Sequence, residues 1–161
     1  MFSINVKSAP SSNDYWTDSG NYVTSWYDSA KNSFNINSAS QLAGLAYLVN
    51  NGNTFSGKTI ILKSNAIDLS AHYWIPIGTS TNVFKGTLDG QINIITNLKT
   101  DDVHPDFVGL IGRNDGGTVK NIGITNTTIK GDNSTGGIVG ENAGTVENCY
   151  HSGSISGGDT T

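Results

Sequence analysis

The sequence predicts an all-β protein, a right-handed parallel β-helix (solenoid) with one short N-terminal capping helix. Three observations predict this fold: the composition favours turns, the last third contains a repeat of solenoid length, and only one segment has helical periodicity. Of the 161 residues, 20 are glycine and 14% are charged, whereas an average domain has about 25% charged residues. Many short strands joined by tight turns fit this composition.

Charge and composition also argue against several function classes. The net charge is −4 and the nine Lys and Arg residues are scattered, so we expect no nucleic-acid partner. No apolar stretch approaches the roughly 18 residues of a membrane span, so we expect no membrane insertion. Residues 1–20 lack the basic start and apolar centre of a signal peptide, and we interpret Met1 as a start placed after signal removal. A single cysteine, Cys149, allows neither an intrachain disulfide nor a cysteine-based zinc site.

Residues 1–37 form an aromatic and polar lead-in without a clean period. Its rings include Tyr15, Trp16, Tyr22, Trp26, Tyr27 and Phe34. Two interpretations stand: the rings cover the end of the core, or they form a platform on which sugars stack. We favour the first, because aromatic rings usually serve burial first.

Residues 38–52 predict the capping helix. Ser38 followed by Gln41 is a capping box, and Asn50-Asn51-Gly52 supplies the stop. One apolar face recurs at helical spacing. It consists of Leu42, Leu45, Ala46 and Val49. Because a short helix is marginal by itself, we expect residues 39–50 to lie on the N-terminal end of the core.

We expect residues 53–161 to form the coils of the β-helix. Short strand candidates follow one another with no further helical segment, which argues against a sheet built from alternating strands and helices. They are Thr59–Leu62, Ala66–Leu69 and Ile92–Ile95, with a turn at the end of Trp74–Gly78 and a tight Asp-Gly turn at the end of Phe84–Gly90.

Two copies of a repeat close the chain. The spacing is 28 positions from Gly109 to Gly137 and 27 from Thr118 to Thr145, and a period of this size is typical of solenoids. Each copy has three strand-like stretches, so we expect three faces per coil and side chains stacked in columns about 4.8 Å apart.

The repeat predicts which side chains share a column. The expected columns are Ile95, Val119 and Val146; Leu98, Ile122 and Cys149; and Leu110 and Ile138. Because Cys149 falls where Leu and Ile fall, we expect it to behave as a small apolar residue. Asn97, Asn121 and Asn148 should form one column at a bend, with hydrogen bonds from coil to coil.

Two segments resemble the GLUG repeat of bacterial surface proteins: residues 107–112, with Gly109-Leu110-Ile111-Gly112, and residues 135–140, with Gly137-Ile138-Val139-Gly140. Upstream segments resemble the lead-in that accompanies such repeats. They are Gln41–Ala46, Phe55–Ile60, Asp68-Leu69, Trp74–Gly78, Phe84–Gly90 and Asn97-Leu98. The resemblance covers about residues 38–157.

The resemblance implies a β-helix in a large extracellular bacterial protein. Such proteins include adhesin-like surface proteins and the non-catalytic stalk regions of zinc peptidases that cleave immunoglobulin A. It carries over no catalytic residue, because the His-Glu-x-x-His motif of those peptidases does not occur in this sequence.

The best alternative is an enzyme that acts on polysaccharides, a lyase or hydrolase. Its candidate cluster is Asp101, Asp102, His104, Asp106 and Arg113. The carboxylates and the histidine could serve acid–base chemistry or bind calcium. The segment 101–106 reads instead as a polar loop between coils, punctuated by proline, and its spacing does not match an EF-hand loop. We therefore predict no catalytic residue, no cofactor and no metal ligand. If the segment did bind an ion, we would expect calcium.

The sequence thus predicts a non-catalytic scaffold and adhesion module, extracellular or on the bacterial cell surface. Its expected partners are further repeats of its own parent chain and a host protein or glycan. The residues 157–161 that follow the second copy contain no capping pattern. We therefore expect an exposed terminal coil at Ile138, Val146 and Ile155, and end-to-end self-association.

Overall fold

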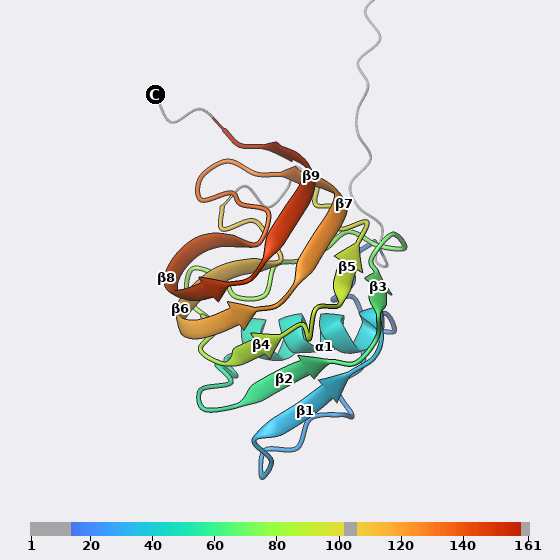
Figure 1. Cartoon of the computed structure of the whole chain (residues 1–161), viewed down its shortest axis with the longest axis vertical. Coiled ribbons are helices and arrows are strands. Elements are labelled where there is room, and N and C mark those ends of the chain that lie inside the picture. The colour runs from blue at the N-terminus through green and yellow to red at the C-terminus, as the bar shows by residue number, and fades with distance from the viewer. Residues whose placement is uncertain (1–13, 102–105, 159–161) are drawn as a thin grey trace, which may run out of the picture.

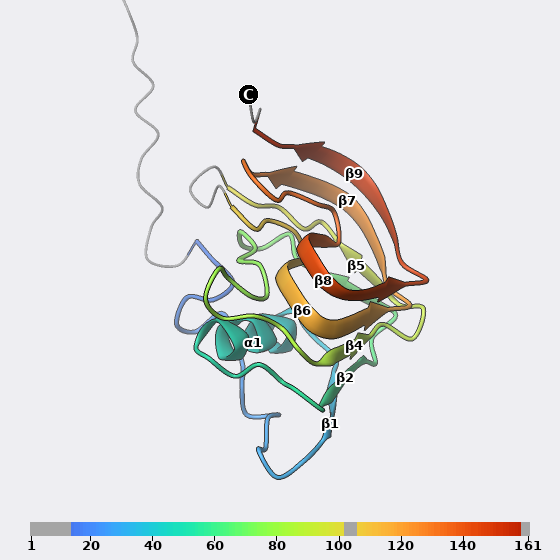
Figure 2. The same ribbon diagram turned by 90° about the vertical axis from the view of Figure 1, so that its left-hand side faces the viewer.

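The computed structural model describes residues 14–101 and 106–158, and these form a parallel β-helix with one short helix near its N-terminal end. The five-stranded sheet contains, in spatial order, β1 (Ser33–Ile36), β2 (Thr59–Leu62), β4 (Thr87–Asp89), β6 (Ile111–Lys120) and β8 (Val139–Glu147). The four-stranded sheet contains β3 (Ala66–Asp68), β5 (Ile94–Thr96), β7 (Gly123–Lys130) and β9 (Tyr150–Ser156). Figures 1 and 2 show both stacks rising from the first coil to the last. The predicted fold class is confirmed.

Helix α1 (Ala39–Asn50) begins and ends where the sequence predicts. The Ser38 side chain accepts a hydrogen bond from the backbone N–H of Gln41 at 3.3 Å, and the Gln41 side chain accepts one from the N–H of Asn37 at 2.7 Å. Gly52 adopts a φ of +101°, a conformation that glycine takes without strain. The predicted apolar face of the helix is buried.

The lead-in segment crosses this helix at Gly44. A Cβ atom at Gly44 would lie 2.0 Å from the carbonyl oxygen of Val23, so only glycine allows this approach. The N–H of Val23 donates to the carbonyl of Ser40 at 2.8 Å. The helix is therefore packed between the lead-in and the core.

Most lead-in rings serve burial, as the favoured interpretation states. Trp16 and Phe34 belong to the core, Trp26 and Tyr27 pack against it, and Phe55 joins their cluster. The lead-in also contains a strand that we did not expect, because β1 precedes the helix and pairs with β2. The solenoid thus starts before the helix.

The predicted register is correct between the two repeat copies. Val119 pairs with Val146, and the flanking pairs Lys120–Glu147 and Gly123–Tyr150 bring Ile122 opposite Cys149. The 28-residue spacing also holds, since Ile111 pairs with Val139. That register brings Leu110 opposite Ile138.

The predicted register is wrong for the upstream coil. Val119 lies beside Leu88 of β4, whereas Ile95 belongs to the other sheet and lies beside Ile124. Leu98 likewise does not join Ile122, because its carbonyl accepts from the N–H of Thr128 at 2.9 Å. The run Ile95–Leu98 on one face and the run Val119–Ile122 on the other share the order apolar, polar, Asn, apolar, so sequence similarity matched segments of different faces.

The three asparagines that we expected in one column lie in two, because the upstream coil was assigned to the wrong face. Asn121 and Asn148 share one bend, but Asn97 lies at another bend, next to Asn126, because Thr96 pairs with Thr125. All four adopt φ between 51° and 60°, the left-handed region that Asn tolerates. The prediction that these asparagines lie at bends is confirmed, and the prediction that they form one column is wrong. The predicted strand start at Ile92 is also wrong, since Ile92 is 88% exposed at a bend with φ 65°.

The repeated glycine that ends each GLUG-like segment has a packing reason. A Cβ at Gly112 would lie 2.3 Å from the carbonyl oxygen of Gly78, and one at Gly140 would lie 2.8 Å from that of Gly112. Successive coils approach through these glycines, so a side chain at either position would push the coils apart.

Candidate functional site

The candidate functional site is the open end of the solenoid, formed by β8 and β9. Each is the last strand of its sheet and is paired on one side only, with β6 or β7. In Figure 1, β8 lies just above β6 and β9 lies beside β7 at the upper end of its sheet. Val146 is 37% exposed and Ile155 is 44% exposed, whereas their partners one coil earlier, Val119 and Ile129, are at most 1% exposed. Apolar side chains and backbone groups are thus presented together, as on any unprotected sheet edge.

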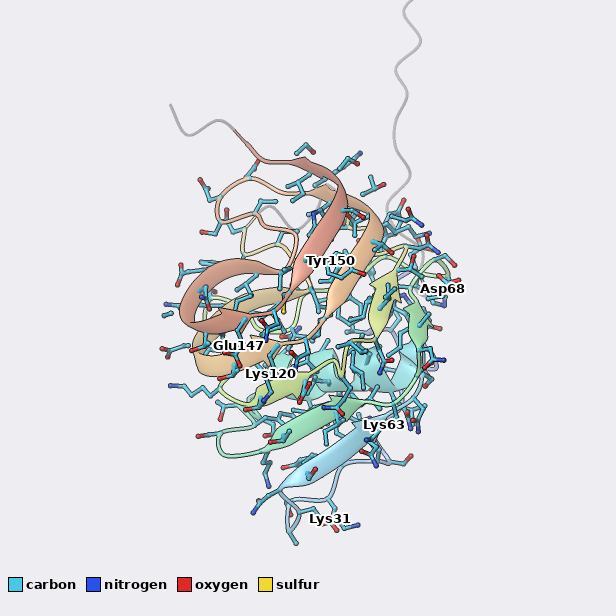
Figure 3. All side chains as sticks on the ribbon, in the orientation of Figure 1. Lys31, Lys63, Asp68, Lys120, Glu147 and Tyr150 are labelled. Atoms are coloured by element: carbon cyan, nitrogen blue, oxygen red, sulfur yellow. The ribbon has the colours of Figure 1, made fainter. Side chains whose placement is uncertain are left out.

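Charges along the outer face of the five-stranded sheet alternate toward this end. Asp89 Oδ2 lies 3.8 Å from Lys120 Nζ, and Lys120 pairs in register with Glu147. Figure 3 shows Lys120 and Glu147 side by side on this face. Burial alone would raise the pKa of Asp89, but hydrogen bonds from Asn121 and Gln91 and the charge of Lys120 lower it below its usual value.

A second charged pair stands at the corner of the same sheet. Arg113 Nε lies 2.7 Å from Glu141 Oε1, and Arg113 Nη1 donates to the carbonyl of Ser80 at 2.8 Å. Both glutamates of β8, Glu141 and Glu147, therefore face a cation on the coil below. An added coil with a cation above them would continue both ladders.

Two asparagine ladders run into the open end. Asn114 Nδ2 donates to Asn142 Oδ1 at 2.7 Å, and Asn148 Nδ2 donates to Asn121 Oδ1 at 3.4 Å. Asn114 is fully buried, so its pairing stabilises the corner in a low-dielectric setting. The Asn114 ladder escaped the sequence analysis, although the Arg-Asn and Glu-Asn dipeptides at 113–114 and 141–142 mark it.

Cys149 and His151 occupy inward positions of the last coil. Cys149 is half-buried against the core, and its Sγ donates to the carbonyl of Glu147 at 3.2 Å. Burial raises the pKa of this thiol, so the thiolate form is disfavoured. His151 pairs in register with Ile124, where three coils carry isoleucine, and its Nε2 lies 2.6 Å from Thr127 Oγ1. Burial lowers the pKa of His151.

The predicted acidic cluster does not converge in the part of the chain that the structure describes. Asp102 and His104 lie outside the described residues. Asp101 is buried and accepts a hydrogen bond from the Tyr15 hydroxyl. Asp106 accepts from the side chain of Asn133 at 3.0 Å, and Arg113 pairs with Glu141 as above. Burial and then Asp101 raise the pKa of Tyr15.

Two further observations concern metals and membranes. Within residues 14–101 and 106–158, no three His, Cys, Asp or Glu side chains are grouped closely enough to hold a metal ion. The helix of the described chain is too short and too polar to cross a membrane.

A separate pocket of about 370 Å³ lies beside α1, with no lining residue from β8 or β9. It opens between the lead-in, the C-terminal end of α1 and the segment that follows β3. Its lining residues are Tyr15, Thr17, Asp18, Tyr47, Asn50, Asn51 and Ile75. Of these the sequence analysis singled out Tyr15 as a possible sugar platform. The others escaped it because they lie in segments far apart along the chain.

Comparison with known proteins finds one partial similarity. Over 86 residues, 52% of this chain, the sequence is 40% identical to halomucin of Haloquadratum walsbyi (strain DSM 16790 / HBSQ001), and the aligned part is 1% of that protein. No family model matches the chain. No solved structure matches it.

Proposed function

We propose that the chain is a non-catalytic β-helical scaffold and adhesion module of a larger secreted or cell-surface bacterial protein. In this role its open end receives a further coil, and the stack serves as a stalk that holds binding surfaces away from the cell. The observation that carries the proposal is the contrast between a covered first coil and an uncovered last coil. A solenoid element of this kind is suited to continue in one direction.

The chemistry of the open end specifies the coil that would fit on it. Parallel strands would pair with β8 and β9, with apolar side chains over Val146 and Ile155 and a Lys or Arg over Glu147. Such a coil would remove apolar surface from water and extend both charge ladders. A second copy meeting the same end would instead bring two Glu147 side chains together, which is repulsive.

The extracellular location and the adhesion role rest on other support. The GLUG-like segments imply surface proteins, and the similar stretch of halomucin is a hundredth of a very long chain. Both support a place in a large multi-coil protein. The separate partners of Asp101, Asp106 and Arg113 favour a scaffold over a polysaccharide-cleaving enzyme.

The test extends the chain by one coil. A copy of residues 131–157 is appended after Gly158, with Lys at the position that corresponds to Glu147. We expect the thermal midpoint to rise by several degrees, because each added interface contributes nearest-neighbour stability. The control carries the same extension with Asp at the positions that correspond to Val146 and Ile155. An equal midpoint in both extended chains, or no rise in either, would contradict stacking on the open end.

A further inference from the structure

We propose that the pocket between the lead-in and α1 binds a neutral pyranose sugar. The inference adds a located ligand site to the proposed function and rests on that function only for the encounter with sugars outside the cell. Three walls form the pocket: Tyr15 to Asp18 of the lead-in, Tyr47 to Asn51 of the helix, and Ile75.

Hydrogen bonds fix the lead-in wall of the pocket to the solenoid. The N–H of Trp16 donates to the carbonyl of Tyr73 at 3.0 Å, and the N–H of Tyr73 donates to the carbonyl of Asp14 at 2.8 Å. Trp16 Nε1 also donates to the carbonyl of Leu69 at 3.1 Å. The pocket wall is therefore formed before any ligand arrives, which lowers the entropic cost of binding.

The helical wall is equally fixed. Asn50 Nδ2 donates to the carbonyl of Pro76 at 3.0 Å, while Asn50 Oδ1 accepts from the N–H of Gly78 at 2.8 Å. The Tyr47 ring stacks on Tyr22, with centroids 4.1 Å apart and an interplanar angle of 15°. These contacts hold Tyr47 in one orientation at the edge of the pocket.

The polar groups suit hydroxyl donors. Asp18 Oδ2 accepts from the N–H of Tyr15 at 2.8 Å, and Asn51 Nδ2 donates to the carbonyl of Tyr47 at 2.8 Å. Two oxygens, Asp18 Oδ1 and the amide oxygen Asn51 Oδ1, receive no hydrogen bond from the described residues. A ligand with adjacent hydroxyl groups can donate to both.

The apolar part of the lining suits the C–H face of a sugar ring. Tyr15 and Tyr47 supply aromatic surface, and Ile75 supplies aliphatic surface. The lining holds one carboxylate and neither Lys nor Arg, so an anionic sugar would meet repulsion and no compensating cation. A volume of about 370 Å³ is near the lower limit of small-molecule sites, so we expect one sugar unit to be held.

The experiment is a titration of the ¹⁵N-labelled 161-residue chain, followed by amide chemical shifts. The probes are six common neutral monosaccharides as methyl glycosides, and glucuronic acid is the anionic comparator. We expect saturable shifts with millimolar affinity for at least one neutral sugar, confined to residues 15–18, 47–52 and 75–78, and no saturation with glucuronic acid.

Three variants test the assignment. Thr17→Phe fills the pocket and should abolish saturation. Asp18→Asn keeps the acceptor for the N–H of Tyr15 but removes the charge, and should weaken binding roughly tenfold, because hydrogen bonds to charged acceptors are about twice as strong as neutral ones. Tyr150→Ala removes an exposed ring on β9, far along the chain from the pocket, and should leave the affinity unchanged.

The outcomes are decisive in either direction. The absence of saturable shifts with every neutral sugar, equal shifts in Thr17→Phe, or glucuronic acid binding as well as the neutral sugars would each overturn the inference. None of these results would alter the stability gain from an added coil, so failure of the sugar site and failure of the scaffold are distinguished.

Discussion

The same kind of apolar column runs to both ends of this solenoid, but its side chains are buried at the first end and exposed at the last. In the five-stranded sheet, Phe34, Ile60, Leu88 and Val119 are all buried, while Val146 in the same column is exposed. At the first end, the non-repeating lead-in covers the column, because Trp26 and Tyr27 pack against Phe34. At the last end, the repeat continues to the outer strands, and no described residue covers Val146 in this way.

This difference shows that the burial of a side chain in the column depends on its position in the stack and not on its residue type. Val119 and Val146 are identical residues at the same repeat position, in adjacent strands and in register. The covered end should therefore limit the stability of the molecule, whereas the open end should tolerate change. Four predictions test this contrast.

The largest expected effect is at the covered end. Leu45 is fully buried in α1, so Leu45→Asp leaves a carboxylate without a partner and should lower the free energy of unfolding by about 3–5 kcal/mol. Urea unfolding measures the loss. Val146→Asp, at the open end, should cost under about 1 kcal/mol. Comparable losses for the two variants would show that the ends do not differ.

The two valines provide the most closely matched pair. Val119→Ala creates a cavity within the stack and should cost about 2–3 kcal/mol, whereas Val146→Ala should cost under about 1 kcal/mol. Both changes remove the same atoms from the same column. Equal decreases in the denaturant midpoint of the two variants would contradict the prediction and would mean that Val146 is covered in solution.

We expect the free energy of unfolding to depend on pH through His151 of the last coil. Burial lowers its pKa in the folded chain, so the unfolded chain binds the proton first. The stability contribution of the neutral ring is complete above the usual pKa of about 6.5 and is lost as the pH falls through the folded pKa.

The measurement compares urea unfolding at neutral and mildly acidic pH. His151→Ile restores the residue type of Ile67, Ile95 and Ile124, so it should raise stability and remove this part of the pH dependence. A pH dependence that persists unchanged in His151→Ile would assign it to other groups.

The smallest expected effect is self-association. Two copies that meet at their open ends cover Val146 and Ile155, although the facing Glu147 side chains oppose the contact, so we expect weak association that grows with concentration. Sedimentation velocity detects it, and the double variant Val146→Lys with Ile155→Lys should abolish it. Dimerisation that survives both lysines would point to a different surface.

Sequence by itself determined what depends on a few neighbouring residues. The capping box at Ser38 and Gln41 and the stop at Gly52 placed the helix. The spacing of Thr118 and Thr145 gave the register of the last two coils, and the asparagines gave the bends. Turn chemistry and helical periodicity act locally, so a short window contains the information.

Tertiary structure alone decided what depends on how coils of unequal length stack. It placed Leu88 and not Ile95 beside Val119, brought β1 into the sheet ahead of the helix, and paired Tyr15 with Asp101. It also brought Asp18, Asn51 and Ile75 to one pocket and left Cys149 half-buried at the open end. Register between coils depends on the number of residues in each turn, and that number varies where the repeat is imperfect. Side chains distant in sequence therefore become neighbours through the stack as a whole, and no local pattern of residues records the contact.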